Sequence, residues 1–438
     1  MTEERVAPAT RIDAEIIVPG DKSMSHRALL LGAQAKGRTY IGNASPAADV
    51  VATAACLRAC GAWVRDFPPG RYALDGAGVG VSLRSPESVL DCANSGTTMR
   101  LLAGVLAGTD SEATLDGDGS LRRRPMARVV DPLRAMGADV DASPGGTPPL
   151  RVRGHRGLTG ISWRSPVASA QVKSAILLAG LSATSPTTVV EPLPTRDHTE
   201  RMLRMCGVDV VSDGVEVTVK PGDPQPFGFR VPGDISSAAF FLALAASRPG
   251  WRIRCPGVGT NPGRTGILSV LEMMGAEMLV AEHEPAGGVE PVGDVEVHGA
   301  SLRGVIISGG LTVRCVDELP VIAVLATQAD GDTEIRDAGE LRSKEVDRIA
   351  MLETGLRALG ASCESTADSL VVHGPSRLHA ARLDAAGDHR LAMAWAIGAA
   401  LVAAGGGESV IAGAEAAAVS YPGFFADLAT VMAPRDSA

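Results

Sequence analysis

A short pattern, Leu-x-x-x-Gly followed by a small or apolar residue, recurs five times along the chain and restricts the folds available to it. The glycines of the pattern lie 76, 70, 68 and 85 residues apart, at Gly61, Gly137, Gly207, Gly275 and Gly360. Each copy ends an amphipathic stretch, and several precede an alternating apolar segment. Each therefore predicts a helix, a glycine able to adopt the left-handed conformation at its carboxyl end, and a strand. The unit, of roughly 70 residues, is longer than the common solenoid repeats.

A second, longer repeat divides the chain in two. VPGDKSMSHRA begins at Val18, and VPGDISSAAFF begins at Val231, 213 residues later. Both copies have a Gly-Asp turn, serines and an apolar stretch, as at a strand-to-helix junction. Three short units fit in each period, so we expect two similar α/β domains. Residues 21–234 form one, residues 1–20 with 235–438 form the other, and the chain crosses between them twice.

The composition excludes several classes of protein. The net charge of −9 makes nucleic acid an unfavourable partner. The apolar tracts are too short or too interrupted by glycine to span a membrane, and the N-terminal residues lack the apolar run of a secretory signal. The seven cysteines include no Cys-x-x-Cys pair, which favours reduced thiols over a metal site. Neither GxGxxG nor GxxxxGK[ST] occurs, which argues against a doubly wound nucleotide-binding fold. We therefore expect a cytoplasmic protein with no nucleic-acid or membrane partner.

Cationic and hydroxyl side chains recur where helices are expected to begin. Lys22, Ser23 and Arg27 follow a Pro-Gly-Asp turn, and Gly96 lies within ANSGTTMR, where it leaves backbone N–H groups accessible. The run RRRPM adds guanidinium groups, including that of Arg124. Helix starts with such groups bind anions. Taken alone, however, the two helix starts are more typical of ordinary capping, and the arginine run is equally typical of a solvated charged surface.

Similar groups occur further along the chain. Asp317 precedes an apolar stretch and is a candidate general base. In ELRSKEVDR we expect Lys344 and Arg348 one turn apart on one helical face, with Glu345 about 100° round from Lys344. Ser169, Gln171 and Arg390 also stand at expected helix starts. Many cations and hydroxyls with few carboxylates suit two polyanionic small-molecule substrates.

Eight motifs, in order along the chain, resemble those of the 5-enolpyruvylshikimate-3-phosphate synthase family. They are DKSMSHR, NSGTTMR, RRRPM, ASAQVKSA, TRDHTERML, VDELPV, ELRSKEVDR and GDHRLAMA, and the resemblance runs from about residue 12 to 428. It implies an α/β fold of two similar domains, each of three βαβαββ units, described as an inside-out α/β barrel, with the active site in the interdomain cleft. It implies transfer of the enolpyruvyl group of phosphoenolpyruvate to the 5-hydroxyl of shikimate 3-phosphate, releasing phosphate, in the shikimate pathway of aromatic amino acid biosynthesis. No metal or cofactor is implied, and we expect a monomer.

The resemblance also implies roles for individual residues. Shikimate 3-phosphate is expected to contact Lys22, Ser23, Arg27, Ser169, Gln171, Arg196, Asp317 and Lys344. Phosphoenolpyruvate is expected to contact Lys22, Gly96, Arg124, Gln171, Arg348 and Arg390. Asp317 accepts the hydroxyl proton, while Glu345, with Lys22, exchanges a proton at the enol methylene. The chain departs from some members at Val419, where they carry a lysine.

Three alternatives remain at this point. UDP-N-acetylglucosamine enolpyruvyl transferases have a cysteine in the loop before the Arg-Pro pair and an asparagine after the N-terminal lysine. Here residues 115–124 contain no cysteine, and Ser23 follows Lys22. A related transferase with a different acceptor and a non-catalytic binding protein are the other two, and turnover with shikimate 3-phosphate distinguishes both from the expected enzyme.

Overall fold

All five glycines of the short repeat follow a helix and have positive φ in the computed structural model, which describes residues 2–403 and 405–433. The φ angles are 82°, 98°, 76°, 98° and 93° for Gly61, Gly137, Gly207, Gly275 and Gly360. A strand begins within three residues of each glycine. The predicted helix, left-handed glycine and strand are therefore confirmed in all five copies, and glycine suits the position because it has no Cβ to oppose positive φ.

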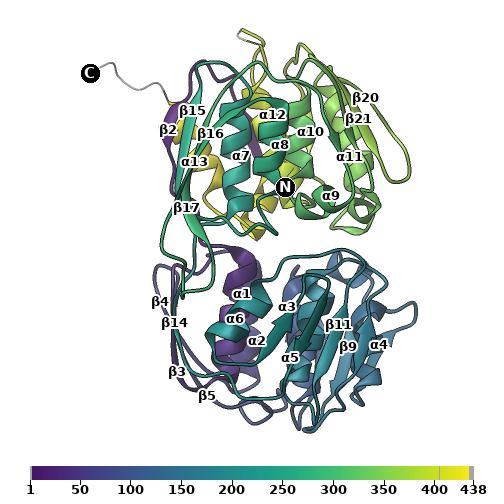
Figure 1. The fold of residues 1–438 in the computed structure, drawn as a ribbon. Helices are drawn as coiled ribbons and strands as arrows, with labels where there is room; N and C mark the ends of the chain where they lie inside the picture. Colours follow the sequence, from purple (N-terminus) through teal and green to yellow (C-terminus); the bar gives the residue numbers. More distant parts are fainter. Residues whose placement is uncertain (1, 404, 434–438) are drawn as a thin grey trace. The chain divides into compact units, whose positions relative to one another are not determined.

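The chain forms two compact units (Figure 1). The inserted unit comprises Gly20–Pro232 and the short segment Pro285–Glu290. The terminal unit comprises Met1–Pro19, Gly233–Glu284 and Pro291–Ala438. Because Pro285–Glu290 belongs to the inserted unit, the chain passes between the units four times, where the long repeat led us to expect two passages.

The inserted unit contains three βαβαββ repeats, each with its own four-stranded sheet. The sheet orders are β14-β3-β5-β4, β6-β7-β9-β8 and β10-β11-β13-β12. In each sheet the first two strands pair in parallel and the remaining pairs are antiparallel. The first repeat consists of β14 (Gly228–Arg230), α1 (Lys22–Gln34), β3 (Lys36–Gly42), α2 (Ala48–Ala59), β4 (Trp63–Phe67) and β5 (Arg71–Ala77). The second consists of β6 (Leu90–Asp91), α3 (Gly96–Ala107), β7 (Glu112–Asp116), the 3-10 helix η1 (Leu121–Arg123), α4 (Ala127–Ala135), β8 (Asp139–Ser143) and β9 (Thr147–Arg153). The third consists of β10 (Ser162–Arg164), α5 (Ala170–Gly180), β11 (Thr187–Val190), α6 (His198–Met205), β12 (Val210–Ser212) and β13 (Glu216–Val219).

The terminal unit repeats this plan, with sheet orders β16-β17-β15-β2, β18-β19-β21-β20 and β1-β23-β22. In its third repeat the two hairpin strands are missing from the sheet, and β1 pairs antiparallel with β23 instead. Its first repeat consists of β2 (Asp13–Glu15), α7 (Ile235–Ala246), β15 (Arg252–Gly259), α8 (Gly266–Met274), β16 (Glu277–Glu282) and β17 (Val292–His298). The second consists of β18 (Ile306–Ile307), α9 (Gly310–Arg314), α10 (Leu319–Ala326), β19 (Gly331–Ile335), η2 (Gly339–Ser343), α11 (Arg348–Ala358), β20 (Ser362–Ser365) and β21 (Leu370–Gly374). The third consists of β22 (Arg382–Asp384), α12 (His389–Ala400), β23 (Ser409–Ala412), η3 (Ala414–Val419), α13 (Phe424–Met432) and β1 (Glu3–Val6).

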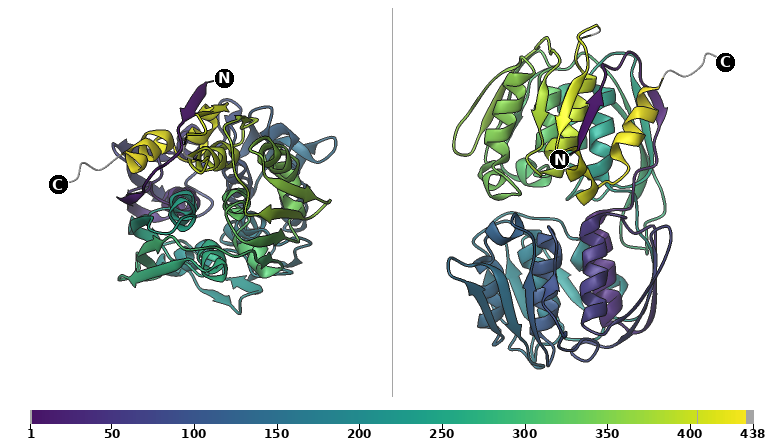
Figure 2. Two further views of the ribbon diagram at one scale, coloured as in Figure 1. Left: turned by 90° about the horizontal axis from the view of Figure 1, so that it is seen from above. Right: turned by 180° about the vertical axis from the view of Figure 1, so that it is seen from behind.

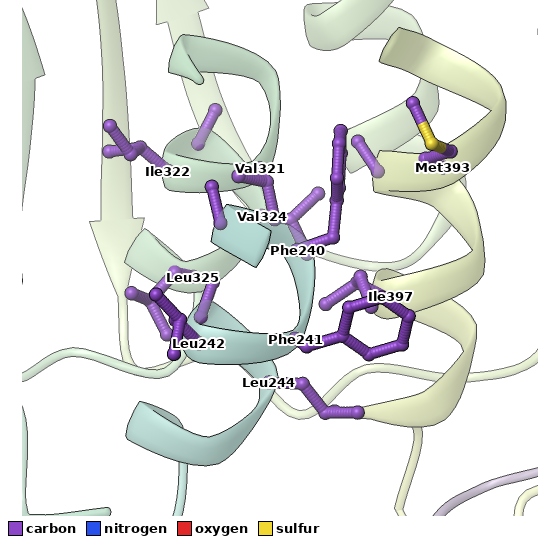
Figure 3. Packing of buried hydrophobic residues seen from close by; sticks show 14 of the residues in the cluster. Phe240, Phe241, Leu242, Leu244, Val321, Ile322, Val324, Leu325, Met393 and Ile397 are labelled. Atoms are coloured by element: carbon purple, nitrogen blue, oxygen red, sulfur yellow. The ribbon is translucent and has the colours of Figure 1, made fainter. Parts of the chain in front are cut away.

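One helix of each repeat lies in the core of its unit. Every residue of α7, α10 and α12 is buried, and these helices pack through Phe240, Phe241, Val324 and Ile397 (Figure 3). The same role in the inserted unit falls to α1, α3 and α5. Small residues bring these helices close together: a Cβ on Gly104 of α3 would lie 2.2 Å from the carbonyl oxygen of Ala175 in α5. The alanine- and glycine-rich composition therefore serves close packing of central helices.

The predicted two-domain α/β architecture is confirmed, and five of its six repeats have the full βαβαββ order among the described residues. Strands lie at the periphery of each unit around the central helices (Figures 1 and 2). The six sheets stay separate, and within the described residues none closes into a barrel, so the name inside-out barrel describes only the placement of sheets around helices. In the part of the chain that the structure describes, no helix is long and apolar enough to cross a membrane.

Candidate functional site

In the inserted unit the predicted site residues lie where the central helices begin. Of the residues in α1, α3 and α5, all are buried except Lys22, Ser23, Thr97, Ala170 and Gln171, which occupy the first two positions of their helices. In every repeat these starts lie at the end of the sheet where the parallel strands have their carboxyl termini. Ligands of open α/β sheets bind at that end, where helix N-termini present free N–H groups.

Side chains cap these helix starts by bonding the backbone N–H of the third residue of each helix. Asp21 accepts a hydrogen bond from the backbone N–H of Met24 at 2.7 Å, and Ser95 accepts one from that of Thr98 at 3.0 Å. Ser169 caps α5 in the same way, through the N–H of Val172 at 3.5 Å. The predicted contact residue Ser169 is thus also the N-cap of its helix, a position that favours serine.

Arg27 joins three helices of the inserted unit. It is buried, and its Nε donates to Thr199 Oγ1 at 2.7 Å while Nη2 donates to Ser174 Oγ at 2.7 Å. Its Nη1 donates to the carbonyl oxygen of Ser23 at 3.0 Å. Arg196 reaches the same residue, with Nη1 3.4 Å from Ser23 Oγ. The structure therefore brings Ser23, Arg27 and Arg196 together, with a hydroxyl beside two guanidinium groups.

A second group surrounds Gly96. A Cβ at Gly96 would lie 2.9 Å from Arg100 Nη1 and 3.2 Å from Arg124 Nη1, so the glycine keeps space between two guanidinium groups. Arg100 donates to the side-chain oxygen of Gln171, whose Nε2 donates to Thr97 Oγ1 at 2.8 Å. The predicted residues Gly96, Arg124 and Gln171 are thus neighbours. Arg100 was missed by the sequence analysis, although it follows Gly96 by one helical turn.

Lys22 is held by a carboxylate of the same repeat. Its Nζ lies 2.9 Å from Asp49 Oδ2, and the two side chains are 15% and 8% exposed. A mostly buried ion pair of this kind fixes the ammonium group in one place while leaving part of it accessible. Asp49 was not among the predicted site residues.

Behind Arg196 lies a buried group of one ammonium and two carboxylates, which we call the Lys173 triad (Lys173, Glu191 and Glu200). Lys173 Nζ lies 2.7 Å from Glu191 Oε2 and 2.8 Å from Glu200 Oε1. Burial alone would lower the pKa of Lys173, but Glu200 and Glu191 outweigh it and raise the pKa above its usual value. Glu191 also accepts a hydrogen bond from Thr195 Oγ1 at 2.7 Å, so the triad anchors the loop that carries Arg196.

In the terminal unit Asp317 lies beside two guanidinium groups. Its Oδ2 is 3.6 Å from Arg264 Nη1 and 4.0 Å from Arg390 Nη2, and its side chain is 20% exposed. Glu318 occupies the N-cap position of α10 without a capping hydrogen bond, and its carboxylate accepts a hydrogen bond from the Ser236 hydroxyl instead. Asp317 and Arg390 are therefore brought together as predicted, and Arg264 is an unpredicted neighbour.

The prediction that Lys344 and Arg348 share one helical face is wrong. The helix α11 begins only at Arg348, because Asp347 caps it by accepting from the N–H of Ala350, and Lys344 ends the 3-10 helix η2. Glu345 instead folds back onto the helix start, with Oε2 2.8 Å from Arg348 Nη2. The intervening non-helical residues place Lys344 and Glu345 in the loop before α11.

Arg348 is clamped between carboxylates. Its Nε donates to Asp388 Oδ2 at 2.7 Å, and it is fully buried. Burial alone would lower the pKa of Arg348, but Asp388 and Glu345 raise it above its usual value. Burial raises the pKa of Asp388, while it lowers the pKa of Lys344 against the opposing charge of Glu340. Of these three groups, Lys344 is the one whose pKa is lowered, so it releases its proton more readily than a free lysine.

The repeats provide the signal that could have identified Arg264. Arg124 precedes α4 by three residues, Arg196 precedes α6 by two, and Arg348 begins α11. Arg264, two residues before α8, holds the equivalent place in the repeat between them, and it is buried against Asp234 and Ser236. Four successive repeats therefore carry an arginine at the start of their second helix.

Comparison with known proteins was made by sequence and by structure. The sequence model of the EPSP synthase (3-phosphoshikimate 1-carboxyvinyltransferase) family matches residues 6–428. A 3-phosphoshikimate 1-carboxyvinyltransferase of Chloroflexus aurantiacus is 49% identical over 427 residues, covering 96% of this chain and 97% of the relative. One from Geobacillus kaustophilus is 48% identical, covering 95% and 97%.

Solved structures agree with these relatives. The EPSP synthase of Acinetobacter baumannii superposes with a TM-score of 0.86 at 37% identity, covering 98% of both chains. The enolpyruvyl transferase NikO of Streptomyces tendae superposes with a TM-score of 0.77, covering 98% of this chain and 96% of its own. At 18% identity, that second likeness concerns the fold alone.

Proposed function

Since this chain belongs to the EPSP synthase (3-phosphoshikimate 1-carboxyvinyltransferase) family, we propose that the groups at its helix starts bind shikimate 3-phosphate and phosphoenolpyruvate and catalyse the carboxyvinyl transfer between them. The reaction serves the shikimate pathway and so the biosynthesis of aromatic amino acids. Its substrates are small and anionic, which suits sites built from cations and free N–H groups.

Shikimate 3-phosphate is assigned to the group around Ser23. The Ser23 hydroxyl and the Arg196 guanidinium, 3.4 Å apart, suit its phosphate, and Arg27 holds them in place. Ser169, Gln171 and Lys22 contribute from neighbouring helix starts. Asp317 and Lys344 of the terminal unit complete the assignment.

Phosphoenolpyruvate is assigned to the group around Gly96. Arg124 offers a guanidinium next to the space that Gly96 leaves open, and Gln171 lies beside it. Lys22 is shared between the two substrates. Arg348 and Arg390 of the terminal unit bind the remaining charge of this substrate, because guanidinium forks match carboxylate and phosphate oxygens.

Asp317 is the general base in this proposal. Its partly exposed carboxylate at the start of α10 is the observation that carries the assignment, because it can reach solvent while two arginines fix it. It takes the proton of the 5-hydroxyl, whose oxygen attacks C2 of phosphoenolpyruvate. Glu345, with Lys22, delivers a proton to C3 and so completes a tetrahedral ketal phosphate. Removal of a proton from the new methyl group then expels phosphate and restores the double bond.

Two substitutions test these roles. Asp317→Asn keeps the size of the side chain but removes its basicity, so kcat should fall by roughly 10²–10⁴-fold with little change in the KM for phosphoenolpyruvate. Arg124→Ala leaves the base intact and should raise the KM for phosphoenolpyruvate. Steady-state kinetics with each substrate varied measures both, and Asp332→Asn, an exposed carboxylate on β19, is the control. A kcat for Asp317→Asn close to that of the unaltered enzyme would show that another group is the base.

We further propose that both groups act on one pair of substrates, so that the active site draws on both units and lies in the interdomain cleft expected for this family. Lys22, Arg27 and Arg124 belong to the inserted unit, whereas Arg348 and Arg390 belong to the terminal unit. The enzyme is proposed to act as a monomer in the cytoplasm, in keeping with seven cysteines that are all free thiols.

A further inference from the structure

The sheet β14-β3-β5-β4 of the inserted unit carries a pocket of about 480 Å³ away from the helix starts. Its lining includes Tyr40, Gly42, Phe67, Arg71 and Arg230. Aromatic residues are scarce in this chain, yet the three exposed ones among the described residues, Tyr40, Trp63 and Phe67, all lie on this sheet. The volume falls in the range typical of small-molecule sites.

Strand register explains the shape of the pocket. Arg230 of β14 pairs with Gly42 of β3, and the antiparallel register of β3 with β5 brings Arg71 to the other side of Gly42. Residues in register on neighbouring strands point to the same face of a sheet. The two arginines therefore flank a residue without a side chain, with Cα atoms about 10 Å apart across two strand spacings. A Cβ at Gly42 would meet no atom within 4 Å, so the floor of the pocket is open.

The walls of the pocket are aromatic. Tyr40, 58% exposed, lies two residues before Gly42 on the same face of β3. Phe67 of β4 is in register with Arg71. Beside Tyr40 the register places Gly228 on one side and Ala73 on the other, and neither fills the space. The pocket is thus lined by two arginine side chains and by the aromatic rings of Tyr40 and Phe67.

Neither arginine of the pocket is neutralised by a carboxylate. Among residues 2–403 and 405–433, the side chain of Arg230 makes no hydrogen bond or ion pair, and the side chain of Arg71 donates only to the carbonyl oxygen of Pro68 at 3.3 Å. Arg38 on the same sheet is paired with Asp75. The nearby carboxylate of Asp66 is taken by Arg58 at 2.6 Å. The pocket therefore has positive charge available for an anion.

We propose that this pocket binds a small aromatic carboxylate. The Arg71 and Arg230 guanidiniums hold the carboxylate over Gly42, because charge-assisted bonds to carboxylates are short and strong. The ring of the ligand packs against Tyr40 and Phe67, since offset and edge-on aromatic contacts are favourable. None of these residues is part of the proposed catalytic groups, so the site is a second one.

Titration with 4-fluorobenzoate, followed by ¹⁹F nuclear magnetic resonance of the full-length protein, tests the proposal. We expect binding with a Kd of about 1 mM, as befits a small ligand with few contacts. Gly42→Leu places a side chain on the floor, where a Cβ meets no atom within 4 Å, and Arg71→Gln combined with Arg230→Gln removes the charges. Each change should raise the Kd at least about tenfold, the loss expected for removing a charge-assisted bond. Gly222→Leu, at another open glycine that does not line the pocket, is the matched control and should leave the Kd unchanged.

Several results would overturn the proposal. These are absence of binding up to about twenty times the expected Kd, or equal affinity in the unaltered protein and Gly42→Leu. Competition by shikimate 3-phosphate or phosphoenolpyruvate would place the probe in the catalytic site instead. Acetate, which has the carboxylate but no ring, should compete poorly, and equal competition would refute recognition of the ring. Circular dichroism melts of every variant ensure that a lost signal is not lost folding.

Discussion

Replacing Lys173 by methionine removes the ammonium group of the Lys173 triad while keeping most of the apolar volume. Lys173 lies 2.7 Å from Glu191 and 2.8 Å from Glu200, and the three side chains are at most 2% exposed. The substitution leaves two carboxylates buried side by side without a counter-charge. Removing one partner of a buried ion pair typically costs about 3–5 kcal/mol. For a unit of this size we therefore expect the melting temperature to fall by roughly 6–20 °C.

The same reasoning predicts a rescue. Glu191→Gln and Glu200→Gln, added to Lys173→Met, remove the unpaired charges, so most of the lost stability should return. Differential scanning calorimetry of the unaltered protein, the single variant and the triple variant measures both steps. A melting temperature within about 2 °C of the unaltered protein for Lys173→Met, which is less than 1 kcal/mol for this size, would refute the argument.

The raised pKa of Lys173 also determines how the stability contributed by this lysine depends on pH. Because the folded pKa of Lys173 is raised, its contribution to stability is fully present below the unfolded pKa of about 10.4 and is lost as pH rises through the folded value. The difference in stability between the unaltered protein and the triple variant, which has no titrating group at this site, should therefore stay constant from about pH 6 to 9, well below that pKa. A difference that shrinks within this window would show that the lysine is not held as a buried cation.

Two further predictions concern packing and motion. Gly104→Ala pushes a Cβ to 2.2 Å from the Ala175 carbonyl oxygen, so it should destabilise the enzyme by about 1–3 kcal/mol in thermal melts, whereas Gly222→Ala, at an open position, should not. If cations of both units hold the same anionic substrates, shikimate 3-phosphate with an unreactive phosphoenolpyruvate mimic should reduce the radius of gyration in small-angle scattering. An unchanged radius would count against a site shared by the two units.

Much of the fold could be predicted because local sequence patterns mark both the repeats and the helix starts. Gly61 and the four equivalent glycines mark turns that only a left-handed residue makes easily, so a local pattern identified a local structure. Three units per period required a sixth repeat, yet the second helix of that repeat, α13, carries no copy of the short pattern. Within the described residues, α13 is followed by no hairpin in its sheet. The strand that replaces the hairpin, β1, comes from the other end of the chain, and no local pattern announces a pairing over that distance.

The site was predictable in its residue types but not in their partners. Gly96, Arg124 and Gln171 follow local motifs, whereas the bond from Arg100 to Gln171 depends on packing between repeats. The placement of Arg264 beside Asp317 in the terminal unit depends on such packing as well. The error at Lys344 had a local cause: Asp347 is a strong N-cap, so α11 starts at Arg348 and leaves Lys344 outside the helix. Side-chain caps compete with helix continuation, so a charged run that reads as one helix can be divided by an aspartate.

The pairing of β1 with β23 sets an order for folding during synthesis. The inserted unit has its own strands once β14 has been made, apart from the segment Pro285–Glu290, while Glu3–Val6 must wait for Ser409–Ala412. At ribosomal rates of about 5–20 residues per second, that wait is roughly 20–80 s. During this interval the first strand of the newborn chain has no sheet to join. A ribosome stalled after residue 300 therefore carries a nearly complete inserted unit and a terminal unit that still lacks most of its central helices.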